Sequence, residues 1–89
     1  MLFIVTYKTS PATRDVGLER FKSTGAPPPA GVKNLGRWHN ADGSGGVTIC
    51  ETDDAGALSA WVNQWTDVLV FDARPALTDE MFGKMLASA

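Results

Sequence analysis

Short segments of alternating type follow one another along the chain, and their order constrains the fold more than any other feature of the sequence. Apolar and β-branched residues indicate strands at residues 1–8, 32–39, 46–52 and 67–73. Between them, residues 10–25 and 55–65 carry helical signals, and a third short helix is predicted to open at 78–80. The predicted order is β-α-β-β-α-β followed by a terminal helix.

The helix boundaries come from capping residues. Ser10 before Pro11 suits a helix start, Thr13 is an equally good cap, and Gly25 predicts the end of that helix. Residues 53–54 are a pair of aspartates that cap the second helix, in which Leu58, Trp61, Val62 and Trp65 are spaced to form one apolar stripe. The second and third predicted strands enclose a turn-rich loop at 40–45, as expected for a hairpin.

This element order is typical of a ferredoxin-like α+β fold. It predicts a four-stranded antiparallel sheet with two helices on one face, the first and third strands at the centre, and a short C-terminal helix. Eighty-nine residues suffice for one domain, so we expect residues 1–89 to form a single unit. A chain of this size has a thin core, which a partner subunit would supplement.

Charge and cysteine content limit the partners. The net charge is −2, so nothing in the overall charge attracts nucleic acid or an anionic membrane. The lone Cys50 excludes an intramolecular disulfide, and neither it nor the lone His39 has the neighbours of a recognisable metal site. We expect no cofactor. Without an apolar run near 18 residues or a charged-then-apolar leader, the sequence predicts a cytoplasmic protein.

Two helices cover only one face of such a sheet, and the other face is predicted to be open. We expect Phe3, Val5, Val47, Ile49, Leu69 and Phe71 to face the helices. The open face would then collect Ile4, Thr6, Arg37, His39, Thr48, Cys50, Val70 and Asp72. A half-apolar face of this kind is usually covered. We therefore predict a homodimer through the open face, with a cavity between the two sheets lined by Thr6, Arg37, His39, Thr48, Cys50 and Asp72.

A resemblance to a known family spans nearly the whole chain. It is carried by residues 1–5, Trp38-His-Asn-Ala-Asp-Gly, Glu51-Thr-Asp-Asp, Trp61 and Trp65. The sequence resembles a bacterial family of small uncharacterised proteins, catalogued as a domain of unknown function. That family is similar to the dimeric α/β-barrel group, which includes cofactor-free monooxygenases, haem-degrading enzymes and stress-responsive dimers. The resemblance implies the fold and a dimer, and it transfers no catalytic residues.

Three functions fit these residues. The favoured one is a homodimer that is non-catalytic or binds a small apolar or aromatic ligand between its sheets. The alternative is a cofactor-independent enzyme of monooxygenase or isomerase type, in which His39 with Asp72 acts as a general base and Arg37 holds an anion. The third is an adaptor whose acidic C-terminal half contacts a larger protein. The sequence favours a protein that is not an enzyme.

Overall fold

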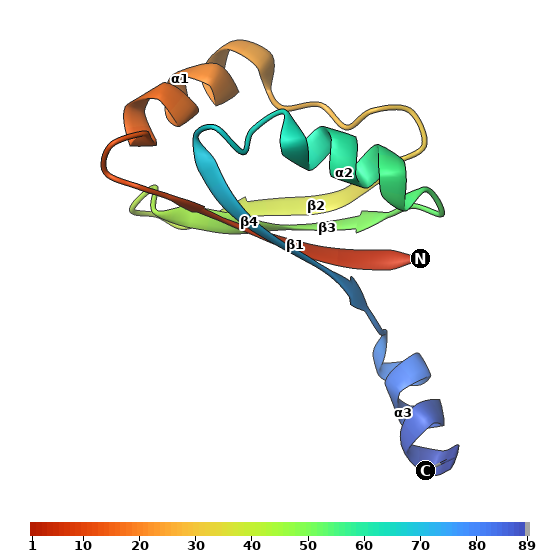
Figure 1. Cartoon of the computed structure of the whole chain (residues 1–89). Helices are drawn as coiled ribbons and strands as arrows, with labels where there is room; N and C mark the ends of the chain where they lie inside the picture. The colour runs from red at the N-terminus through yellow and green to blue at the C-terminus, as the bar shows by residue number, and fades with distance from the viewer. Residues whose placement is uncertain (89) are drawn as a thin grey trace.

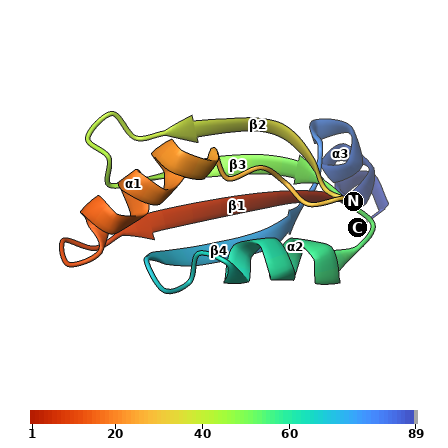
Figure 2. The ribbon, with the colours of Figure 1, turned by 90° about the horizontal axis from the view of Figure 1, so that it is seen from above.

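The protein folds as one antiparallel sheet with two helices on one face and a third helix at its C-terminal end (Figure 1). The computed structural model describes residues 1–88 (Figure 1). The strands are β1 (Leu2–Thr9), β2 (Lys33–His39), β3 (Gly45–Glu51) and β4 (Leu69–Ala76), in the order β2-β3-β1-β4. The helices are α1 (Arg14–Thr24), α2 (Ala55–Asn63) and α3 (Asp79–Ser88). Figure 2 shows α1 and α2 over the same face of the sheet. The predicted ferredoxin-like α+β fold is confirmed.

The termini of α1 fix how this helix lies over the sheet. Its N-cap is Thr13, the second of the two expected starts, and the Thr13 hydroxyl donates to the Val68 carbonyl at 2.8 Å. That bond ties the start of α1 to the entry of β4. At the other end, Gly25 has φ of 70° and its N–H donates to the Phe21 carbonyl at 2.7 Å, as predicted for a left-handed glycine cap.

Helix α2 is shorter than the sequence indicates. Its N-cap is Asp54, whose carboxylate accepts a hydrogen bond from the Ala57 N–H at 3.0 Å. The predicted helix runs to residue 65, but α2 ends at Asn63, and a tighter turn follows in which the Trp65 N–H donates to the Val62 carbonyl at 3.0 Å. The apolar stripe still faces the sheet, since Leu58, Trp61 and Trp65 are buried. Within residues 1–88, no helix has the length and apolar character needed to cross a membrane.

Strand β4 is longer than predicted. The sequence places its end at Arg74-Pro75, whereas the strand continues to Ala76, which pairs with Leu2. Pro75 lies opposite Phe3 inside the strand. A proline is tolerated here because β4 is an edge strand, so the missing N–H faces no neighbouring strand.

The predicted faces of β1 and β4 are confirmed, and those of β2 and β3 are wrong. Phe3 pairs with Cys50 and Val5 pairs with Thr48, so Cys50 and Thr48 face the helices. Thr48 in turn pairs with Arg37, which places Arg37 and His39 on that face as well. Val47 and Ile49 lie on the open face instead. Both faces of β3 carry apolar residues, so the hydrophobic pattern alone cannot orient the strand. Its pairing with β1 determines which of its residues face the helices.

A β-bulge at Leu35 adjusts the orientation of β2. Asn34 pairs with Cys50 and Gly36 pairs with Ile49, so one extra residue stands between two ladder pairs. The alternation of side chains therefore reverses at this point. Asn34 shares the helix-covered face with Arg37 and His39, while Gly36 and Trp38 lie on the open face.

Candidate ligand-binding cavity

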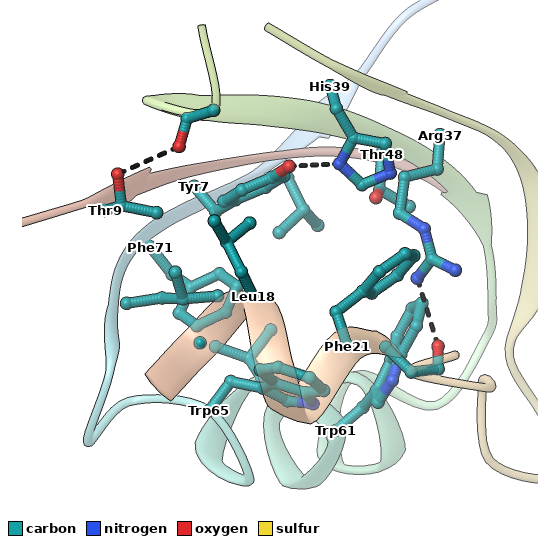
Figure 3. Close-up of a pocket in the computed structure, with 16 residues that line it drawn as sticks. Tyr7, Thr9, Leu18, Phe21, Arg37, His39, Thr48, Trp61, Trp65 and Phe71 are labelled. Carbon is teal, nitrogen blue, oxygen red and sulfur yellow. Dashed lines mark hydrogen bonds between the residues drawn. The ribbon is translucent and has the colours of Figure 1, made fainter. Parts of the chain in front are cut away.

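A cavity of about 190 Å³ lies between the sheet and the two covering helices. Its apolar wall combines residues of β1, β4, α1, α2 and the turn after α2, including Val5, Leu18, Phe21, Trp61, Trp65 and Phe71 (Figure 3). Its polar wall comes from β1, β2 and β3 and contains Tyr7, Thr9, Arg37, His39 and Thr48. The cavity is thus mostly apolar, with several aromatic rings and a few polar groups on the side of the sheet.

Tyr7 and His39 form the central polar pair of the cavity. The Tyr7 hydroxyl and the His39 Nδ1 are hydrogen-bonded, and the two rings meet edge to face with centroids 5.8 Å apart. The His39 ring also stands edge to face with Phe21, at 5.1 Å. Figure 3 shows these rings converging from the sheet and from α1. The imidazole is held by two aromatic neighbours, and it remains exposed at the rim of the cavity.

Arg37 anchors the connector that follows α1. Its guanidinium donates to the Ala26 carbonyl at 3.0 Å and to the Gly25 carbonyl at 2.9 Å. The same group stacks 5.0 Å from the centroid of the Phe21 ring. Arg37 therefore places a positive charge at the cavity and fixes the end of α1 above β2.

Burial alters the acidity of the phenol in the cavity. The partly buried position of Tyr7 raises the pKa of its hydroxyl above the ordinary value, and the charge of Arg37 opposes this shift. The phenol therefore stays protonated through neutral pH. It can donate one hydrogen bond and accept another.

An ion pair holds the two covering helices together over the cavity. Arg20 of α1 donates to both carboxylate oxygens of Asp67, at 2.8 and 2.7 Å, and to the Gln64 carbonyl at 3.1 Å. Its guanidinium also lies 5.4 Å from the ring centroid of Trp65. The hydrogen bonds from Arg20 lower the pKa of Asp67. This contact fixes the separation between α1 and the turn after α2, and hence the width of the cavity.

The structure divides the six site residues predicted from the sequence into three groups. Arg37, His39 and Thr48 line the cavity. Cys50 lies on the same face but is fully buried in the core beside the cavity. Thr6 and Asp72 lie on the open face, where the Thr6 hydroxyl donates to the Asp72 carbonyl at 3.5 Å.

The predicted His39–Asp72 pair is not formed. Asp72 pairs with Thr6 on the open face and accepts a hydrogen bond from Arg74 Nε at 2.8 Å, whereas His39 lies on the helix-covered face. A side chain cannot pass through a paired sheet to reach the other face. The partner of His39 is the Tyr7 phenol instead.

The cavity within the chain lies on the helix-covered side of the sheet, and it includes Tyr7, which was not among the six predicted site residues. One signal for Tyr7 was present, because Gly46 is the residue opposite it in the ladder. A Cβ at Gly46 would lie 2.6 Å from Tyr7 Cε1, so the glycine leaves room for the tyrosine ring. Among residues 1–88, no three His, Cys, Asp or Glu side chains gather as a metal site.

The fold and the cavity together define a ferredoxin-like α+β domain with a small aromatic pocket between its sheet and helices. The chain belongs to the family described as a domain of unknown function, DUF3303, whose family model matches residues 1–89. The predicted membership of a small uncharacterised family is confirmed. A search of curated proteins gave no match. The family description names no activity.

Proposed function

We propose that this protein binds a small monocyclic aromatic compound carrying an anionic or hydrogen-bond-accepting substituent. The observation that supports the proposal is the cavity between sheet and helices, in which aromatic rings surround a short polar wall. Binding sites for small molecules usually combine an apolar lining with a few polar groups that orient the ligand. The proposed site is thus within one chain, and it replaces the predicted site between two sheets.

The volume limits the ligand to one ring. A dry cavity of about 150 Å³ accepts benzene in a well-studied engineered protein. The cavity here, at about 190 Å³, has room for a single ring and one small substituent. Phe21, Trp61 and Trp65 offer ring faces and edges against which an aromatic ligand can pack.

The polar wall favours a ligand whose substituent accepts hydrogen bonds. Arg37 is the one charged side chain that lines the cavity, and the lining formed by the described residues includes no Asp or Glu. The groups beside it are the Tyr7 phenol, the His39 imidazole and the Thr48 hydroxyl. A carboxylate or a phenolate satisfies these donors, whereas an ammonium group would meet the positive charge of Arg37.

The same polar wall favours binding over catalysis. His39 is paired with a phenol that burial keeps protonated, and not with a carboxylate that would stabilise an imidazolium. Cys50 is buried outside the cavity, and burial raises the pKa of its thiol, so it offers no activated nucleophile.

Titration with three matched probes tests the proposal. Benzoate, toluene and benzylamine share a ring and differ in the charge of one substituent. Binding can be measured by two-dimensional NMR or by calorimetry, and we expect benzoate to bind most tightly. The largest chemical-shift changes should occur at Tyr7, His39 and Trp61. His39→Leu removes the imidazole of the wall and Thr48→Val removes its hydroxyl, and each should weaken benzoate binding about tenfold.

The control is Thr6→Val, which makes the same change on the open face and should leave binding unaltered. Equal binding of all three probes would refute the role of the polar wall. Absence of binding by every probe at millimolar concentration would refute the proposal as a whole.

A further inference from the structure

Helix α3 has no contact that buries any of its residues. It follows β4 after only two residues and projects on the side of the sheet opposite α1 and α2 (Figure 1). Five large apolar side chains of residues 77–88, here called the arm, are 43–58% exposed: Leu77, Met81, Phe82, Met85 and Leu86. A surface helix normally packs such a stripe against another element. In an isolated chain, the apolar stripe of the arm is exposed to water.

The open face of the sheet is the second uncovered apolar surface. Its apolar residues come from all four strands: Ile4, Trp38, Val47, Ile49 and Val70. Of these, Trp38 is 60% exposed and Val70 68% exposed. The Trp38 ring lies flat over Gly36, where a Cβ would approach its Cη2 to 2.3 Å. The ring thereby widens the apolar surface along β2.

We propose that two copies of this chain associate by exchange, with the arm of each copy lying across the open face of the other. Every chain carries one uncovered helix and one uncovered sheet face, so a two-fold pair covers both surfaces of both copies with the same contacts. Helix on sheet is also the packing that α1 and α2 already use on the other face.

The short linker before α3 favours a second copy, and not the same chain, as the partner of the arm. Leu77 and Thr78 are the two residues between β4 and α3, and two residues span at most about 7 Å. Thr78 is also committed to the helix, since its hydroxyl accepts from the Met81 N–H at 3.2 Å. The arm therefore continues away from its own sheet, whereas a second copy can approach it freely.

The apolar area that the arm and the open face present is large enough for a stable dimer interface. A large apolar side chain exposes about 150–200 Å² when free, so the half-exposed residues of one arm and one open face together present roughly 800 Å². Two such contacts amount to about 1,600 Å², the usual size of a specific interface.

Two ion pairs within the chain lie near the two surfaces. On the open face, Arg74 Nε lies 2.8 Å from Asp72 Oδ1. On α3, Lys84 Nζ lies 3.4 Å from Glu80 Oε1, on the side of the helix away from the apolar stripe. Covering the apolar centres therefore leaves neither of these two pairs without its partner.

Light scattering after size exclusion tests the proposal on the full chain. We expect a mass of about 19 kDa, twice the 9.5 kDa chain. Met85→Glu places a charge on the apolar stripe, and Trp38→Glu places one on the open face; each should shift the protein to monomer. Lys84→Glu, on the polar side of the same helix, should leave the dimer intact.

Mixing distinguishes exchange from other arrangements. In an equimolar mixture, the intact arm of the Trp38→Glu chain can bind the intact face of the Met85→Glu chain, so heterodimer should reappear although each variant alone is monomeric. A wild-type monomer at 100 µM would overturn the proposal. So would a dimer that Met85→Glu leaves unchanged, because the arm would then take no part. Circular dichroism should show that each variant is folded, because the arm has no buried residue and Trp38 is 60% exposed.

Discussion

Replacing Gly46 with alanine should damage both the hairpin and the cavity. The added Cβ would lie 2.3 Å from the Trp38 carbonyl oxygen, 2.6 Å from Tyr7 Cε1 and 2.7 Å from the Tyr7 hydroxyl oxygen. Favourable contacts between such atoms begin near 3.5 Å. The carbonyl belongs to the β2 backbone and cannot withdraw without opening the β2–β3 ladder, while the tyrosine ring can withdraw only by leaving His39.

The cost has two parts. Forcing a methyl group into a packed position costs about 1–3 kcal/mol, and losing the Tyr7–His39 hydrogen bond costs about 0.5–1.5 kcal/mol. In a domain of this size, each kcal/mol lowers the melting temperature by about 4–8 °C. Thermal unfolding monitored by circular dichroism should therefore show a decrease of roughly 6–36 °C for Gly46→Ala.

The matched control is Gly83→Ala in α3, where a Cβ would meet no atom within 4 Å. Alanine is the better helix former, so this variant should melt at or above the wild-type temperature. A Gly46→Ala protein that melts within 1 °C of wild type would refute the argument that Tyr7 and the β2 backbone close over this glycine.

Three further predictions follow from individual contacts. Asp54→Ala removes the N-cap of α2 and should lower the free energy of unfolding by about 0.5–2 kcal/mol in urea denaturation, whereas Asp53→Ala, next to the cap, should cost less. The Cys50 thiol should react with a disulfide reagent only after denaturant is added, because it is fully buried and its pKa is raised; rapid labelling of the folded chain would contradict this. Tyr7 is the one tyrosine in the sequence, so ultraviolet difference absorbance titrates it alone. Its raised pKa should move phenolate formation above pH 10.0, and stability should fall as the pH rises from that value through the folded-state pKa, while an unshifted titration would show that the ring is open to water.

The fold could be predicted from local signals because the strands, helices and caps all agreed. Gly25 ends α1 with a left-handed cap, Asp54 begins α2, and Thr78 begins α3. These residues act within a few positions of themselves, so a single sequence reveals them. The order of elements then determines the topology of the sheet.

The faces of β2 and β3 could not be predicted in the same way. Val47, Ile49 and Cys50 are all apolar, so β3 has no polar side to exclude from the core. What orients it is the pairing of Phe3 with Cys50, a contact between residues far apart in the sequence. Because β2 takes its orientation from its pairing with β3, one wrong assignment of the β3 faces moved Arg37, His39, Thr48 and Cys50 to the wrong face, whereas Thr6 and Asp72 lie where they were predicted.

The bulge at Leu35 determines which residues of β2 face the helices on each side of it. Upstream of it Asn34 faces the helices, and downstream of it Arg37 and His39 do so too, which a strand of strict two-residue period cannot achieve. Deleting this single residue would hardly change the composition, yet one half of the strand would turn over and bring Trp38 toward the cavity or remove Asn34 from the covered face. Substitutions along β2 therefore adjust the pocket, whereas an insertion or deletion at Leu35 replaces it.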